Sequence, residues 1–131
     1  MIRCIRLWTG PEGDSVFETG RLEVGPGQHG KASGIPILAR ELSFQETEAP
    51  ASGEWHQDPL PQFVLMLSGE LEFEVRGGAR FTLFPGDVLI AQDNSGSGHR
   101  WQLKGPAPWR RAYVVYEPRA DLHFIADGEP A

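Results

Sequence analysis

The segment 70–76, ELEFEVR, alternates between apolar and charged residues, and this alternation limits the possible fold more than any other feature of the sequence. Because successive side chains of a β-strand point to opposite faces, Leu71, Phe73 and Val75 would lie on one face and the three glutamates on the other. Gly77-Gly78 follows at once and supplies the positive φ that a two-residue hairpin turn needs. The segment is therefore predicted to be a half-buried antiparallel strand followed by a hairpin.

Comparable strand patterns recur along the chain, separated by turn signals about every 8 to 12 residues. They cover 2–8, 16–24, 35–44, 63–67, 81–83, 88–90, 100–103 and 111–117. The segment 122–126 fits either a final strand or one helical turn. The 16 glycines and 11 prolines among the 131 residues suit short strands joined by tight turns. We therefore expect a single all-β domain that forms a jelly-roll β-barrel or a sandwich.

Charge and cysteine content exclude several classes of partner and compartment. The formal net charge of −6 disfavours nucleic acids and anionic membranes, whose binding needs a clustered basic surface. Arg110-Arg111 is the one dense basic spot, and we expect it to face solvent or to pair with glutamates. Cys4 is the single cysteine, so a reducing, cytoplasmic compartment is expected. No apolar run approaches the length of a membrane span, and Arg3 and Arg6 argue against an export signal.

The run 63–67, FVLML, is apolar at every position. A strand with this pattern has two faces to cover, one by the barrel interior and the other by a second sheet or a second subunit. We therefore expect a homodimer.

Residues that can bind a metal ion precede this run. Five residues of the same parity would share one face if the strand is continuous: His56, Asp58 and Gln62 before the run, and Val64 and Met66 within it. Two prolines between Asp58 and Gln62 interrupt the ladder, so the inference holds for His56 with Asp58 and for the run from Gln62 onward. A second histidine must come from a distant strand, and His99, after the predicted meander, is well placed to supply it.

At these residues the chain resembles the cupin superfamily, over roughly 55–101. The first cupin motif has two histidines one residue apart, then a glutamate and a glycine. The matching positions here are His56, Asp58, Gln62 and Gly69. The second motif opens with Gly-Asp, as in Gly86-Asp87, and ends in a histidine, as at His99. The resemblance implies a cupin-like jelly-roll barrel over 1–131, with its core at about 35–117, and a divalent metal bound inside it.

The sequence departs from the cupin pattern at the ligand positions. Asp58 replaces the second histidine, Gln62 replaces the glutamate, and His99 falls two residues late. A neutral amide oxygen is a poorer ligand than a carboxylate, so metal affinity should fall unless Asp58 supplies the charge. Asp58 also precedes Pro59, and an Asp-Pro step commonly shapes a turn, which is its alternative role.

We expect the metal ligands to come from His56, Asp58, Gln62 and His99. The residues expected to line the pocket around them are Trp55, Val64, Met66, Trp101 and Tyr113. The remaining histidines, His29 and His123, are expected at the surface. A barrel of this size suits a small-molecule ligand or substrate.

Three functions fit these residues, and the sequence does not decide whether the protein is an enzyme. The first is a metal-dependent enzyme that acts on a small metabolite with Fe, Mn, Ni or Zn at His56, Gln62 and His99. The second is a metal-free ligand-binding or sensor module that is not catalytic. The third is an Fe(II)-dependent oxygenase in which His56, Asp58 and His99 form a two-histidine, one-carboxylate triad. Oxygenases of the 2-oxoglutarate-dependent type place an arginine about ten residues after the distal histidine, and Arg110 lies eleven after His99.

Overall fold

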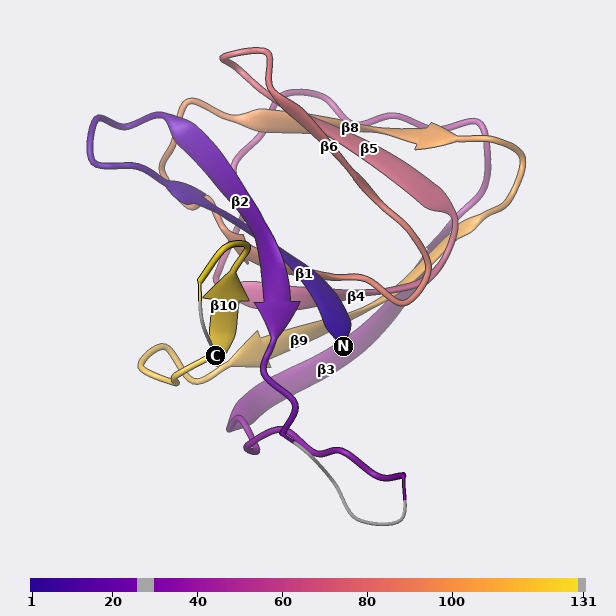
Figure 1. Cartoon of the computed structure of the whole chain (residues 1–131). Helices are drawn as coiled ribbons and strands as arrows, with labels where there is room; N and C mark the ends of the chain where they lie inside the picture. Colours follow the sequence, from indigo (N-terminus) through magenta and orange to yellow (C-terminus); the bar gives the residue numbers. More distant parts are fainter. Residues whose placement is uncertain (26–29, 130–131) are drawn as a thin grey trace.

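The computed structural model describes residues 1–25 and 30–129, and in that part of the chain all ten regular elements are strands (Figure 1). Seven form one sheet: β1 (Ile2–Thr9), β2 (Ser15–Leu22), β3 (Ala39–Thr47), β4 (Gln62–Ser68), β7 (Val88–Gln92), β9 (Trp109–Tyr116) and β10 (Phe124–Ala126). Three form the other: β5 (Glu70–Val75), β6 (Arg80–Leu83) and β8 (His99–Lys104). Within residues 1–25 and 30–129, no helix is long and apolar enough to cross a membrane. His29, expected at the surface, lies outside the described residues.

The two sheets form the layers of a jelly roll. The larger sheet has the order β10-β2-β1-β7-β4-β9-β3 and the smaller one β6-β5-β8. Figure 1 shows the smaller sheet facing β1, β4 and β9 across the interior of the molecule. Consecutive strands β4 and β5 lie in different sheets, as do β7 and β8, so the chain winds between the two layers. The predicted all-β jelly roll is confirmed.

The alternating segment 70–76 folds as predicted. Leu71, Phe73 and Val75 of β5 are buried, Glu70 is exposed, and the other two glutamates are partly exposed. The turn differs from the two-residue prediction: Val75 N–H donates to Ala79 O, and only Gly78 of the glycine pair has a positive φ, 97°. The loop therefore holds three residues, a common hairpin length that places glycine at the left-handed position.

The alternation of β5 points its apolar residues into a core between the sheets. This core also contains Ile5 and Leu7 of β1, Val64 and Met66 of β4, Phe81 and Leu83 of β6 and Leu89 of β7. Phe73 stacks on Phe81, with ring centroids 4.9 Å apart, and Phe81 packs on Phe17 at 4.7 Å. Residues from both layers thus hold the barrel together.

A second apolar cluster covers part of the outer face of the larger sheet. Its buried members are Cys4, Phe63, Val88, Ile90 and Tyr116. Leu122 and Phe124 of the C-terminal segment pack against it, and Phe124–Ala126 is strand β10, paired with β2, which settles the choice between strand and helical turn. The same chain therefore covers Phe63, where a second sheet or second subunit was expected, while Leu67 at the other end of β4 remains 54% exposed.

Cys4 is expected to be unreactive in the folded protein. Its side chain is fully buried, and burial, followed by the negative charge of Asp87, raises the pKa of the thiol to about 12. Because the thiolate is the reactive form, a thiol reagent such as DTNB should not label native protein at pH 8 and should label one thiol per chain in denaturant. Rapid labelling under native conditions would contradict this burial.

Candidate metal centre

A cavity of about 360 Å³ lies between the sheets and is open to solvent at one end. All four predicted ligands line it, together with three of the predicted pocket residues. These seven residues are His56, Asp58, Gln62, Val64, His99, Trp101 and Tyr113. His56 and His99 therefore line one cavity together with Gln62, although the two histidines are far apart in sequence.

The backbone holds the two histidines side by side. His56 N–H donates to His99 O at 2.9 Å, and His99 N–H donates to His56 O at 3.0 Å, an isolated antiparallel bridge next to the first residue of β8. Gly98, with a φ of 109°, turns the chain into this bridge, a conformation that favours glycine. The imidazole rings meet edge to face with centroids 4.5 Å apart. The bridge therefore fixes both rings at one end of the cavity.

His99 is buried between two carboxylates. Its Nδ1 lies 2.8 Å from Asp93 Oδ2, and its Nε2 lies 3.3 Å from Asp58 Oδ1. Burial by itself would lower the pKa of His99, but the hydrogen bonds and negative charges of Asp58 and then Asp93 outweigh it and raise the pKa. A carboxylate on Nδ1 holds that nitrogen as the N–H donor of the neutral ring and leaves Nε2 as the ligand atom.

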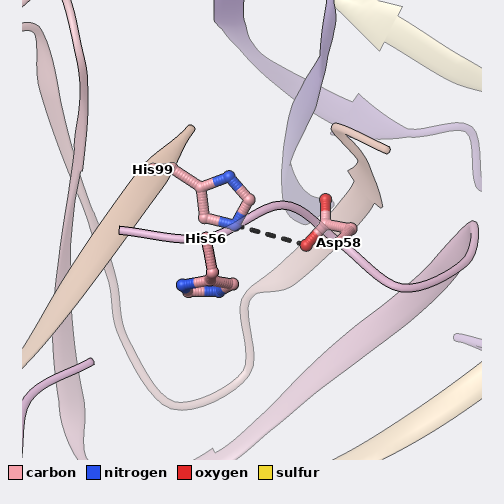
Figure 2. A group of neighbouring side chains, drawn as sticks. All are labelled: His56, Asp58 and His99. Atoms are coloured by element: carbon pink, nitrogen blue, oxygen red, sulfur yellow. Dashed lines mark ion pairs between the residues drawn. The ribbon is translucent and has the colours of Figure 1, made fainter. Parts of the chain in front are cut away.

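His56 is exposed at the cavity mouth, and a backbone carbonyl orients its ring in the same way. Its Nδ1 lies 2.7 Å from Glu54 O, which can only accept a hydrogen bond, so Nδ1 carries the proton and Nε2 is free. Figure 2 shows the His56 and His99 rings next to Asp58. Both histidines therefore present Nε2 while their other nitrogen is already engaged.

The two carboxylate oxygens of Asp58 have different partners. Asp58 Oδ2 accepts a hydrogen bond from Asp93 N–H at 2.8 Å, and Asp58 N–H donates to Asp93 O, also at 2.8 Å. These contacts shape the loop. Asp58 Oδ1 faces His99 instead, as the dashed line in Figure 2 shows. One carboxylate oxygen is thus structural, and the other is directed at the histidines.

Asp93 is a site residue that the sequence did not identify. It is fully buried and accepts hydrogen bonds from Thr9 Oγ1 at 3.0 Å and from Ser15 Oγ, besides holding His99. Gly96 leaves room for it, because a Cβ at that position would lie 2.1 Å from Asp93 Oδ1. An acidic residue between a strand and a Gly/Ser-rich loop is the available sequence signal, and by itself it does not distinguish a buried carboxylate from a loop residue at the surface.

Three ligand atoms converge at this end of the cavity. One atom each of His56, Asp58 and His99 lie within 4.8 Å of one another. Two imidazole nitrogens and one carboxylate oxygen are donors suited to a first-row divalent ion. The residues present therefore fit a metal, with Asp93 and the Glu54 carbonyl fixing the two rings from behind.

Comparisons with known proteins found similar solved structures but no matching sequence. No protein-family model matches the sequence, and the search of curated proteins found no match. Similar solved structures include an uncharacterised Klebsiella pneumoniae protein with a double-stranded β-helix domain (22% identity, 67% of this chain and 74% of that chain, TM-score 0.46). The cupin domain of Schizosaccharomyces pombe Cnp3 is also similar (14% identity, 88% of this chain and 83% of that chain, TM-score 0.48). A cupin domain of an XRE-family transcriptional regulator from Enterobacter cloacae is similar as well (14% identity, 91% of this chain and 100% of that chain, TM-score 0.34).

The strands of this chain form a two-sheet jelly roll. Within it, two of the predicted pocket residues lie elsewhere. Met66 is part of the buried core, where its sulfur accepts a hydrogen bond from Trp109 Nε1 at 3.2 Å. Trp55 stacks against the guanidinium groups of Arg76 and Arg100 and is not among the residues that line the cavity.

The arginine pair divides between the two faces of β9. Arg110 is exposed and pairs with Glu46, as expected, and it is not among the cavity residues. The oxygenase interpretation therefore loses the arginine on which it relied. Arg111 is buried, contrary to the prediction, and hydrogen-bonds Tyr113, Gln45 and Thr47. His123 is partly buried next to Asp121 and does not line the cavity.

Proposed function

We propose that this chain is a cupin-like protein that binds a divalent metal ion through His56, Asp58 and His99 and acts on a small metabolite in the adjoining cavity. One observation carries the proposal: both imidazoles have Nδ1 engaged by a fixed acceptor, and their ligand atoms converge with that of Asp58 within 4.8 Å. A histidine that serves only packing does not need this arrangement, whereas metal-binding histidines almost always have it.

Three protein ligands leave coordination positions for substrate and water. Fe, Mn, Ni and Zn all accept imidazole and carboxylate ligands, so the donor set is compatible with each. When bound, such an ion supplies Lewis-acid polarisation of a substrate oxygen, or in the case of iron a site for dioxygen. Gln62 lines the same cavity, and in this proposal its amide group contacts the metal or the substrate.

The opposite wall of the cavity suits a ligand rich in oxygen atoms. Arg111 Nε donates to Tyr113 Oη at 3.0 Å, so the tyrosine O–H hydrogen remains available to a ligand. Arg111 Nη2 also donates to Gln45 Oε1 at 3.0 Å, which leaves the amide N–H₂ of Gln45 available. Both residues line the cavity. A small carbonyl compound or hydroxy acid would match these donors, with its other end toward the histidines.

Isothermal titration of chelator-treated protein with Zn²⁺, Mn²⁺, Ni²⁺ and anaerobic Fe²⁺ tests the metal. We expect one ion per chain for at least one of them, and loss of this binding in both His56→Ala and His99→Ala. His123→Asn is the matched control, because it removes a histidine outside the cavity and asparagine tolerates the positive φ of 56° at that position. Equal metal affinity in His56→Ala, His99→Ala and His123→Asn would show that the ion binds outside this site.

Gln62→Glu should tighten metal binding by about tenfold or more, because it adds a carboxylate to a cavity that already contains Asp58. Gln102→Glu adds the same charge on the exposed surface of β8 and serves as the control. The dissociation constants of both variants and of the unchanged protein should be measured at one ionic strength. Unchanged affinity for Gln62→Glu would show that this side chain does not reach the ion.

A metal-free binding module is the second candidate, and the contact between His99 and Asp58 favours it. This pair satisfies Nε2 without an ion, and within residues 1–25 and 30–129 no buried side-chain nitrogen or oxygen lacks a hydrogen-bond partner. In that case none of the four ions would bind, and a small organic acid would raise the melting temperature of the metal-free protein. The titration above and a thermal-shift screen with small carboxylic acids separate the two functions.

A further inference from the structure

Within residues 1–25 and 30–129, strand β3 is an edge of the larger sheet. It pairs with β9 on one side only, and Figure 1 shows it at the margin of the molecule. Its residues from Ala39 to Glu46 are all exposed. Natural proteins usually blunt such an edge with proline, lysine or a short strand, because its free backbone groups can pair with another chain. From Glu41 to Thr47, β3 is in continuous register with β9 and contains no proline, glycine or lysine.

Large apolar side chains project from the outer face of this edge. Leu42 is 61% exposed and Phe44 68% exposed. Leu67 of β4, also exposed, lines a shallow depression together with Phe44. Exposed apolar residues that gather in one place mark an interaction surface more often than residues scattered singly.

The sequence of β3 is complementary to itself when the strand is reversed. If two copies run antiparallel about a twofold axis at Ser43, then Leu42 of each copy lies opposite Phe44 of the other. In the same register Arg40 lies opposite Glu46. The apolar pair lies on the outer face, where directly opposed side chains stabilise a sheet. Arg40 lies in the β-bulge between Ala39 and Glu41, and Glu46 already pairs with Arg110 of the same chain. A twofold axis at Leu42 would instead oppose Arg40 to Phe44, and one at Phe44 would oppose Leu42 to Glu46.

We propose that β3 pairs antiparallel with β3 of a second copy about Ser43, which joins the two larger sheets across a homodimer. The self-complementary register is the observation that selects a second copy over another protein. The pairing does not require the metal, and it places the homodimer expected from the run 63–67 on a different surface.

The same pairing borders the metabolite cavity. The inner face of β3 contributes Glu41, Ser43 and Gln45 to the lining, and these residues stand at the open edge of the sheet. A second strand beside them extends the wall of the cavity. In this register Glu41 of one copy lies next to Gln45 of the other, so each cavity has side chains from both copies at its rim.

Analytical ultracentrifugation of the metal-free chain tests the assembly. We expect twice the 14.5 kDa chain mass for the unchanged protein, and a single chain for Leu42→Lys and Phe44→Lys at the same concentration. Both positions are exposed, so the variants should keep the circular dichroism spectrum of the fold. Phe84→Lys, which alters an exposed phenylalanine in the turn after β6, should remain a dimer. A monomeric unchanged protein, or a dimer that survives both substitutions, would overturn the proposal.

Disulfide trapping tests the register. In Ser43→Cys the two new thiols face each other across the axis, within the Cα separation that a disulfide accepts, whereas in Gln45→Cys they are four residues apart along the strands. Buried Cys4 does not compete. Oxidised glutathione should therefore produce a covalent dimer in Ser43→Cys and not in Gln45→Cys. Equal cross-linking of both variants would indicate collision and would contradict the register.

Discussion

Replacing Phe73 with alanine is expected to lower the free energy of unfolding by about 3–5 kcal/mol. Phe73 is 4% exposed, stacks on Phe81 and lies 6.0 Å from the His99 ring, measured between ring centroids. Its removal leaves a cavity between the two sheets that aromatic neighbours on both sides cannot readily fill. Urea denaturation followed by tryptophan fluorescence measures the change.

Phe84→Ala is the matched control for this substitution. Phe84 is 46% exposed in the turn after β6, so its truncation should change the free energy of unfolding by no more than about 0.5 kcal/mol. If Phe73→Ala cost no more than Phe84→Ala, the inward register of β5 would be wrong.

Asp93 should be the most sensitive polar residue of the chain. Asp93→Ala removes the acceptor shared by Thr9, Ser15 and His99 and leaves three donors without it, two of them buried. Loss of one member of a buried charged network costs about 3–5 kcal/mol. Chemical denaturation of the metal-free protein should show a loss of this size, whereas Asp14→Asn, at an exposed position, should leave stability nearly unchanged.

The conservative variant separates folding from positioning. Asp93→Asn keeps the size of the side chain but weakens the hydrogen bond that orients His99, so it should lower metal affinity by about 10–100-fold in protein that is still folded. Unchanged affinity in folded Asp93→Asn would show that Asp93 supports the fold without positioning the ligand.

The part of the fold that follows from local patterns could be predicted. The alternation of β5 depends on a period of two and on which face is buried, and both are visible in the residues themselves. The pairing of His56 with His99 could be anticipated because the cupin resemblance relates two distant motifs. In the structure the two histidines meet across one backbone bridge.

What could not be predicted depends on contacts between distant segments. Asp93 acquires its role only when the ends of β1 and β2 bring Thr9 and Ser15 against the loop before His99. Met66 has the same parity as Gln62 and Val64, yet it lies deeper under Trp109 and faces the core. Arg111 is buried because the ring of Trp109 packs against its guanidinium group and the side chains around it accept its hydrogen bonds.

Anomalous diffraction from crystals grown with Zn²⁺ and measured on both sides of the zinc edge tests the central claim most directly. The account predicts one strong peak within about 2.0–2.2 Å of His56 Nε2, His99 Nε2 and an oxygen of Asp58, and no peak there in crystals of His99→Ala. A cavity without anomalous density at saturating zinc, with ions only at surface carboxylates, would contradict it.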